Sequence, residues 1–220
     1  FAGNSETKIT GSLTNNGLLD VDSDVRFDAS AATTPADNNG GEINVAANTL
    51  FKIDATGTGS DAVVLDNNRT VSSGNVVGGI TGSGTLRFLS ADGNTHVVNA
   101  DDGGHAFPAT VQHQAGANGS GTLEVRVTST SGDQDVTISF GGGSGDLTAD
   151  QDITFNVVNN TGTDEISEIE AGTVTANARL DARTSAGAVY TSSPTIDLST
   201  LKVTAGTASL PGAASLTATA

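Results

Sequence analysis

The sequence predicts an all-β protein built as a β-solenoid-like stack of short strands, and three observations support this fold class. Apolar residues alternate with charged residues from Leu19 to Phe27, which is the pattern of a strand with one buried face. Glycine and asparagine recur every few residues, so each element is expected to be short. Several segments are repeated, which indicates that one structural unit is used more than once.

The repeats differ in length and in spacing. The segment from Gly17 to Phe27 returns 128 positions later, and a looser copy with one inserted residue begins at Gly41. The segment 82–88 recurs 37 positions later, and the segment 133–138 recurs 17 positions later. A step of 17 fits one turn of a solenoid with three short strands, and a step of 37 fits about two such turns. A β-sandwich or jelly roll with an open edge, completed by a neighbour's strand, is the alternative.

The first two thirds of the chain are predicted to consist of short strands and turns. Two strands between Thr7 and Phe27 would be joined at Asn15-Asn16-Gly17, which is a strong turn signal. Residues 42–54 are predicted to form a second strand pair. Further strands are predicted at 62–65, 70–71, 75–77, 85–89, 96–99, 109–112, 123–128, 136–140 and 153–158.

The C-terminal third has a different composition. In the segment 163–171, Ile166 and Ile169 lie three residues apart after an acidic stretch, which fits a short helix as well as a loop or a strand. Strands are predicted at 173–180, 188–191 and 195–203, and the tail 206–220 is expected to be an edge strand or disordered. The chain thus divides into a donor or capping strand at 1–13, a repetitive β domain at 14–160, and an Ala/Thr/Ser-rich β segment at 161–220 that packs on the same domain.

Composition excludes several classes of function. The chain has no cysteine, so it contains neither a disulfide framework nor a thiolate site for a metal. Its 25 acidic and 9 basic residues give a formal charge of −16, and a surface of this sign repels nucleic acid and anionic lipid. No continuous apolar run is long enough to span a bilayer, so membrane insertion is not expected.

Acidic residues at alternate positions are candidates for a calcium site, because Ca²⁺ prefers several carboxylate oxygens. Asp20, Asp22 and Asp24 form one such triplet, and Asp150 and Asp152 form the matching pair in the later repeat. On a strand these side chains would share one face about 7 Å apart, which equally describes a solvated acidic stripe. The triplet also lacks the glycine and the glutamate of an EF-hand loop. No cofactor is therefore expected, with Ca²⁺ as the alternative.

No catalytic residue is assigned. His96, His105 and His113 are spaced nine and eight residues apart, which matches no metal-binding or catalytic motif. The Gly-Ser-Gly at 143–145 lies among predicted strands, whereas a nucleophile elbow needs a strand-to-helix turn. Structural roles are expected for all three histidines. We therefore expect a protein that is not an enzyme. A polysaccharide-acting β-helix enzyme remains a further hypothesis, besides a structural protein and an adhesin.

Two segments carry a family resemblance. The segments 9–18 (ITGSLTNNGL) and 80–88 (ITGSGTLRF) resemble the β-strand repeats of bacterial surface-antigen and autotransporter passenger regions and of surface-layer proteins. The likeness covers roughly residues 7–160 and lies in composition. It implies an extracellular or cell-surface, non-enzymatic β-solenoid used in adhesion or surface coating. The chain departs from autotransporters in lacking a C-terminal translocator barrel segment, so self-transport is not expected.

The function expected from the sequence is that of a structural subunit of an extracellular filament or surface layer. Copies of the chain would assemble head-to-tail by β-strand pairing. The N-terminal strand would make the contact, with Phe1, Ile9 and Leu13 as anchors, and the tail 205–220 is the second candidate for it. A terminus folded onto its own domain is the alternative for this strand. An adhesin-type passenger fragment that presents a binding surface is the alternative function.

Overall fold

Strands account for nearly all regular structure in the described part of the chain. The computed structural model describes residues 6–29, 36–38, 40–58, 62–72, 75–91, 93–100, 104–116, 118, 120–129, 135–149, 153–159, 165–176, 179–184, 195–203, 207–209 and 215–218, with the backbone alone beyond residue 153. Within these ranges there is no α-helix, and η2 (Gly141–Gly143) is a single 3₁₀ turn. The all-β prediction is confirmed.

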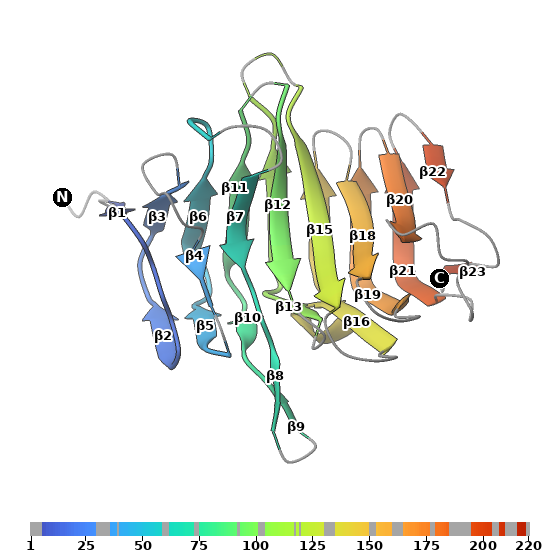
Figure 1. The fold of residues 1–220 in the computed structure, drawn as a ribbon, viewed down its shortest axis with the longest axis horizontal. Helices are drawn as coiled ribbons and strands as arrows, with labels where there is room; N and C mark the ends of the chain where they lie inside the picture. The colour runs from blue at the N-terminus through green and yellow to red at the C-terminus, as the bar shows by residue number, and fades with distance from the viewer. Residues whose placement is uncertain are drawn as a thin grey trace.

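Two long sheets run along the molecule, each built from strands in chain order (Figure 1). Sheet A contains β1 (Thr7–Thr10), β3 (Val25–Asp28), β6 (Leu50–Asp54), β11 (Thr85–Leu89), β14 (Thr110–Gln114), β17 (Asp146–Ala149) and β19 (Glu165–Ala176), and then β21 (Thr195–Val203) and β23 (Ser215–Ala218). Sheet B contains β4 (Ala36–Asp37), β7 (Ala62–Asp66), β12 (Thr95–Ala100), β15 (Thr122–Ser129), β18 (Ile153–Asn159), β20 (Arg179–Thr184) and β22 (Thr207–Ser209). Neighbouring strands in both sheets are parallel.

A third face is formed by the strands that precede each strand of sheet A in the chain. It begins with the parallel strands β2 (Leu18–Val21), β5 (Glu42–Val45) and β10 (Gly79–Thr81), and it continues with β13 (His105–Phe107) and β16 (Asp135–Phe140). The long strand β19 joins this face to sheet A, because Glu165–Glu170 pairs with β16 and Thr173–Ala176 pairs with β17. β10 and β13 are neighbours but form no ladder with each other.

One hairpin departs from the parallel pattern. β8 (Thr70–Ser72) and β9 (Asn75–Val77) pair antiparallel and project away from the stack of strands (Figure 1). Their insertion lengthens the chain between two neighbouring strands of the third face. Leu18 lies opposite Glu42, which is 24 residues later, whereas Glu42 lies opposite Gly79, which is 37 residues later.

The core lies between the sheets and is built by alternation along each strand. In β11, Leu86 and Phe88 are buried, while Thr85, Arg87 and Leu89 alternate with them and are only partly buried. Phe27, Ile53 and Phe88 lie opposite one another on successive strands of sheet A and are at most 2% exposed. Each fully buried side chain of this size contributes about 1.5–3 kcal/mol, so such rows stabilise the stack.

The predicted hairpin between Thr7 and Phe27 is wrong. Three strands occupy this segment, and β1 pairs in parallel with β3, with Thr7 opposite Val25. The turn signal at Asn15 carries the chain into β2 on another face, because the side chain of Asn15 is held by the Asn38 side chain and the Glu42 carbonyl. Likewise, β5 and β6 belong to different sheets and do not pair with each other.

The helical alternative for 163–171 is also wrong, because the described part of this segment, 165–171, belongs to β19. Val136 lies opposite Ile166 and Ile138 lies opposite Ile169, with a register shift between the two pairs. A β-bulge therefore explains the spacing of three, since one extra residue in β19 lies between the two paired positions. The tail contains β22 and β23, and the predicted strand at 188–191 lies outside the described residues.

The repeat of 17 does not correspond to one step along a sheet. Paired parallel strands are separated by 18 residues where Thr7 faces Val25, and by up to 37 where Glu42 faces Gly79. The similar segments 133–138 and 150–155 reach β16 and β18, which lie on different faces. The repeats therefore mark similar strand-and-turn units on successive faces.

Candidate binding site

The third face is interrupted between β10 and β13, next to the point where the hairpin leaves the stack. Gly79 lies against Ala106, since a Cβ added at Gly79 would come within 2.7 Å of the Ala106 Cβ. A side chain replaces the missing ladder, because Asn67 Nδ2 donates to the Ala106 carbonyl oxygen at 3.0 Å. Backbone pairing resumes past the strands, where the Ala109 N–H donates to the Gly82 carbonyl at 2.9 Å.

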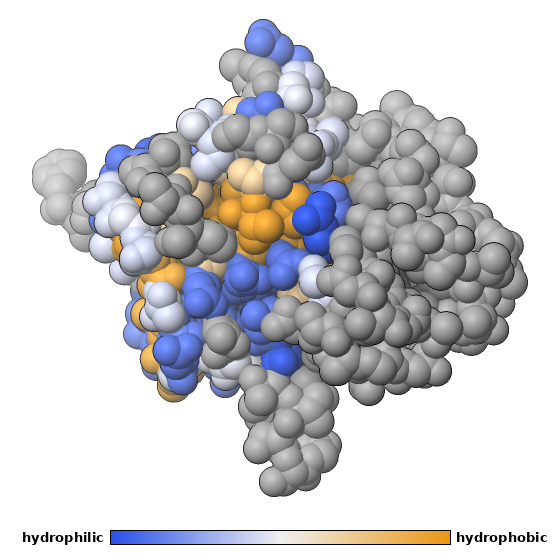
Figure 2. Space-filling view, in the orientation of Figure 1, coloured by the Kyte–Doolittle hydropathy of each residue, from blue (hydrophilic) through white to orange (hydrophobic). Residues whose placement is uncertain are grey.

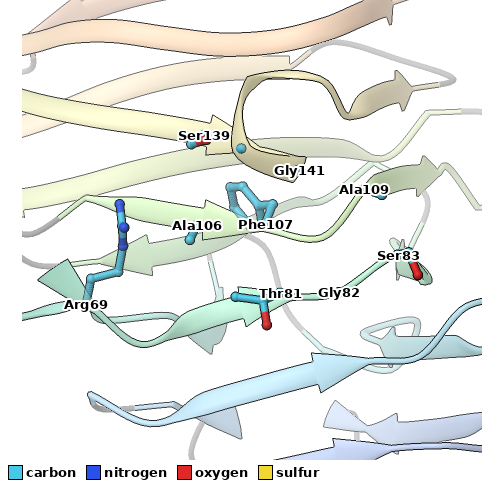
Figure 3. A pocket seen from close by; sticks show the side chains of 10 residues that line it. Arg69, Thr81, Gly82, Ser83, Ala106, Phe107, Ala109, Ser139 and Gly141 are labelled. Atoms are coloured by element: carbon cyan, nitrogen blue, oxygen red, sulfur yellow. The ribbon is translucent and has the colours of Figure 1, made fainter.

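A pocket of about 470 Å³ opens at this interruption (Figure 3). It is lined by Arg69, Thr81, Gly82, Ser83, Ala106, Phe107, Ala109, Ser139, Gly141 and Gly142. These residues come from four separate parts of the chain: the segment before the hairpin, the end of β10, β13 with the turn after it, and β16 with η2. The volume lies in the range of small-molecule binding sites, about 300–1,000 Å³.

Small side chains and glycine turns make the space. Ala106 lies opposite Ser139 in the ladder of β13 and β16, and both face outward. Gly82 has φ +99°, and a Cβ there would approach the Val45 carbonyl oxygen to 2.2 Å. Only glycine therefore fits at this position. Gly142 has φ +63°, and nothing lies within 4 Å of the Cβ position. The rim at Gly142 is therefore open.

Phe107 lies at the base of the pocket and belongs to an aromatic stack in the core. Phe107 is 3% exposed, and its ring stacks between those of His105 and Phe140, with centroid distances of 5.1 and 4.9 Å. Stacked rings at these separations hold one another in a fixed orientation. The base is therefore apolar, with Ala106 and Phe107 in the lining.

Arg69 supplies the only formal charge among the residues that line the pocket. Burial of the ring is the main cause of the lowered pKa of His105, and the nearby Arg69 guanidinium lowers that pKa further. The Thr81 hydroxyl donates to Glu42 Oε1 at 2.7 Å, so this threonine offers its oxygen as an acceptor. The pocket thus combines a guanidinium, hydroxyl groups and an apolar base.

Behind the interruption, three asparagines stack along the corner between sheet B and the third face. Asn15 Nδ2 donates to Asn38 Oδ1 at 2.8 Å, and Asn38 Nδ2 lies 3.2 Å from Asn67 Oδ1. Asn38 and Asn67 are fully buried. Asn38 also donates to the Gly79 carbonyl at 3.1 Å. Because a buried amide is costly to leave without partners, this stack fixes the corner that positions β10.

The three histidines are buried in the core, at most 1% exposed. His105 Nε2 lies 2.8 Å from the Arg126 carbonyl oxygen, which only accepts, so this nitrogen carries the proton. Burial lowers the pKa of His96, and it lowers the pKa values of His105 and His113 to about 4. All three rings are therefore neutral near pH 7.

A serine–histidine contact lies among these side chains. Ser90 Oγ is 2.8 Å from His113 Nε2, but both residues are only 1% exposed. His113 Nδ1 has no hydrogen-bond partner within the described residues, whereas a catalytic triad needs a carboxylate there. The pair is a buried hydrogen bond inside the core.

Comparison with known proteins finds no match: no family model, curated protein or solved structure matches this chain. Among the described residues, no helix has the length and apolar character needed to cross a membrane. Nor does the described part of the chain place three or more histidine, aspartate or glutamate side chains where they could hold a metal ion. Function is therefore inferred from the chain's own geometry and chemistry.

The aspartates proposed for calcium do not share one strand face. β2 ends at Val21 and β3 begins at Val25, so the chain turns a corner within the triplet. Asp20 Oδ1 accepts from Asn44 Nδ2 at 3.0 Å, and Asp24 Oδ1 accepts from the Leu50 N–H at 3.0 Å. Asp22 is exposed at the corner. Asp150 and Asp152 lie outside the described residues.

The proposed assembly anchors lie at the first strands of the stack. Ile9 and Leu13 are partly buried and pack against the core of their own chain. β1 pairs on one side with β3, and no described strand pairs with its other side. Phe1 lies outside the described residues. The described N-terminal segment therefore covers its own core and keeps an open edge.

Sequence reasoning missed a row of basic residues on the outer face of sheet A. Lys8, Arg26, Lys52 and Arg87 lie opposite one another on four successive strands. Carboxylates neutralise the first three through the pairs Lys8–Asp28 (2.7 Å), Arg26–Asp54 and Lys52–Glu6 (2.5 Å). The four residues are spaced 18, 26 and 35 apart, so no fixed period reveals the row. The pocket was missed for a similar reason, because its lining comes from distant segments.

Proposed function

We propose that the protein is a β-solenoid and the structural subunit of an extracellular filament or surface layer, with copies of itself as partners. Each turn of the solenoid would add one strand to sheet A, one to sheet B and one to the third face. Parallel pairing between the main strands supports a solenoid over a sandwich, because sandwich sheets are antiparallel. The resemblance of the sequence to surface-antigen repeats supports an extracellular or cell-surface location.

The observation that carries this proposal is the pair of open edges on sheet A. At the N-terminal end, the Thr7 N–H donates to the Asp24 carbonyl at 2.8 Å. Backbone groups alternate in direction along a strand, so the N–H groups of Lys8 and Thr10 face the open side. At the other end, no described strand pairs with the outer side of Thr200–Val203. Open strand edges readily pair with another chain.

The register of sheet A indicates how two copies would meet. The row that contains Lys8 continues through Gln112, Thr148 and Thr175 to Lys202. A second copy that extends the sheet would place its Lys8 opposite Lys202 and its Ile9 opposite Val203. The row of sheet A that contains Ile9 would then continue from one copy into the next. Because the two edges differ, the contact is head-to-tail and builds a filament.

The exposed side chain of Leu18 supports the proposal that the N-terminal end of the stack is a contact surface. Leu18 is 64% exposed on β2, which pairs on one side only among the described strands. In a lone molecule, a leucine at an open edge exposes apolar surface to water and favours aggregation. When a second chain covers it, the same side chain is buried and stabilises the contact. β1 and β2 would therefore be covered together in the filament.

The test uses a substitution that blocks only the open edge. Lys8→Pro removes an N–H that faces outward and leaves the Thr7 N–H bond to β3 in place. Lys8→Ala is the matched control, since it removes the same side chain and keeps the N–H. Negative-stain microscopy should show filaments for the wild type and Lys8→Ala, and monomers for Lys8→Pro. Monodisperse wild-type particles at every concentration would contradict the proposal.

A second candidate function is an adhesin-type passenger that presents a binding surface. Two observations favour it: the pocket on the third face, and an apolar patch over β7 and β12 bordered by hydrophilic surface (Figure 2). Contiguous apolar surface of this kind marks interaction sites. Particles that stay monomeric yet bind a partner through this surface would favour the adhesin function over the filament.

A further inference from the structure

The turn between β14 and β15 joins sheet A to sheet B in the middle of the stack, since each of these strands has a neighbour on both sides. Asn118 and Ser120 lie in this turn and are exposed, and with the glycine between them they form the sequence Asn-Gly-Ser. Asn-X-Ser or Asn-X-Thr, with any residue except proline in the middle, is the acceptor sequence for N-linked glycans. Both residues that such an acceptor requires are therefore exposed to solvent.

The end of this turn is fixed against the neighbouring turn of the stack, which joins β11 to β12. Ser120 Oγ accepts a hydrogen bond from the Gly93 N–H at 2.9 Å. Gly121 lies against Ser90, since a Cβ added at Gly121 would come within 2.6 Å of the Ser90 Cβ. Asn118 precedes this anchored part of the turn and is exposed. A bulky group on Asn118 can therefore extend into solvent while the rest of the turn stays anchored.

The same acceptor sequence occurs at two other places, and the structure distinguishes them from the first. Asn68 begins an Asn-Arg-Thr sequence, but it is only 9% exposed and follows Asn67 of the buried asparagine stack. A glycan at Asn68 would have to displace close-packed chain. Asn159 is the last residue of β18, and its side chain and the two residues after it lie outside the described part of the chain. Exposure therefore favours Asn118 over Asn68 as the acceptor.

We propose that Asn118 is a modification site that carries an N-linked glycan. The donor in this reaction is a lipid-linked oligosaccharide diphosphate. The bond between its anomeric carbon and the diphosphate oxygen breaks, a bond forms between that carbon and Asn118 Nδ2, and the amide loses one proton as the lipid diphosphate leaves. The product keeps the side-chain carbonyl oxygen and one N–H of Asn118 for hydrogen bonding. This inference rests on the proposed extracellular or cell-surface location, because such glycans belong to secreted chains.

A glycan at this position is compatible with the proposed filament. Figure 1 shows the connections from sheet A to sheet B along one side of the stack. Strand pairing between copies would instead use the two ends of the stack, and β14 and β15 lie away from both ends. Because every copy in a head-to-tail filament has the same orientation, each would carry its glycan at the equivalent corner. The hydrophilic glycans would leave the end contacts free and oppose side-by-side contact between filaments.

Secretion of the full chain from a eukaryotic host, with an added signal peptide, tests the proposal. Digestion with peptide-N-glycosidase in heavy-oxygen water labels each former glycan site for mass spectrometry, and incubation without the enzyme controls for spontaneous deamidation. We expect the label at Asn118 and none at Asn68. Secreted protein without a glycan at Asn118 would overturn the proposal. Filaments are scored on the same sample by negative-stain microscopy, so failure of glycosylation and failure of self-assembly are distinguishable.

Two substitutions locate the site by the step in gel mobility that the glycan causes. Asn118→Gln removes the acceptor nitrogen and Ser120→Ala removes the required hydroxyl, so each should remove one step. Ser120→Thr keeps a hydroxyl and should keep the step, which separates loss of the acceptor sequence from loss of the Gly93 contact. Asn16→Gln is the matched control, because Asn16 is exposed and precedes a glycine but is followed by no serine or threonine at the third position. A step that persists in both Asn118→Gln and Ser120→Ala would contradict this location.

Discussion

Lys8 lies directly opposite Arg26 in the parallel ladder of β1 and β3. Two cations thus face each other across one step of sheet A, and Lys52 and Arg87 continue the same row. The row is tolerated because carboxylates of Asp28, Asp54 and Glu6 pair with its first three members. Like charges directly opposite on neighbouring strands are otherwise destabilising.

Asp54 is the carboxylate of this row whose loss should matter most. It is 3% exposed, it pairs with Arg26, and its other contacts are with the N–H and hydroxyl of Thr56. Asp54→Asn keeps the shape but leaves Arg26 without its counter-charge, between Lys8 and Lys52. We expect urea unfolding to show a loss of about 2 kcal/mol, less than for a fully buried pair because the Arg26 side chain is 34% exposed. Asp22→Asn, at an exposed corner, should stay within about 0.5 kcal/mol, and equal losses for the two variants would contradict the role of Asp54.

The asparagine stack should be a main determinant of stability. Asn38→Ala removes the acceptor for Asn15 and the donor to the Gly79 carbonyl, and it leaves a cavity at a fully buried site. We expect a loss of about 3 kcal/mol, since each buried polar group left unpaired costs about 1–3 kcal/mol. Asn44→Ala removes an exposed hydrogen bond to Asp20 and is the control. A loss below about 1 kcal/mol for Asn38→Ala in chemical unfolding would show that the stack is dispensable.

Acid should destabilise the fold through its buried histidines. His105 and His113 have pKa values of about 4 in the folded protein, below the value of 6.5 expected when unfolded. Between these values the unfolded chain binds more protons, so stability falls as the pH falls from about 6.5 to about 4. Each histidine should cost roughly 2–3 kcal/mol at pH 4.5 relative to pH 7.5.

The measurement is urea unfolding of the wild type and His113→Gln at both pH values. Carboxylates titrate alike in the two proteins, so the difference isolates the histidine. His113→Gln should lose less stability on acidification than the wild type, and His105→Gln should behave in the same way. An unchanged pH dependence in both variants would show that burial of these rings does not control acid stability.

Local features of the fold could be predicted from the sequence, and its long-range pairing could not. The strand at 85–89 was predicted with its bounds, because the alternation around Leu86 and Phe88 is a property of neighbouring residues. The turn signal at Asn15 was misread as a hairpin, since its partner Asn38 lies 23 residues away. The bulge that places Ile166 opposite Val136 and Ile169 opposite Ile138 depends on the neighbouring strand β16.

The candidate site was beyond the reach of sequence reasoning for the same physical reason. Arg69 and Ser139 are 70 residues apart in the sequence, and only the stacking of strands brings them to one pocket. Insertions of different lengths, such as the hairpin β8–β9, hide the register that aligns β10 with β5.

Cysteine cross-linking at the two open edges of sheet A tests self-assembly most directly. The chain has no native cysteine, so Lys8→Cys combined with Lys202→Cys introduces a single pair. Neighbouring strands lie about 4.8 Å apart, within the Cα separation of about 4.4–6.8 Å that a disulfide needs. Lys8→Cys with Thr200→Cys, two residues out of register, is the control. The proposal predicts a ladder of disulfide-linked oligomers for the first pair and far fewer for the second; monomers alone under oxidising conditions, or equal linking of both pairs, would contradict it.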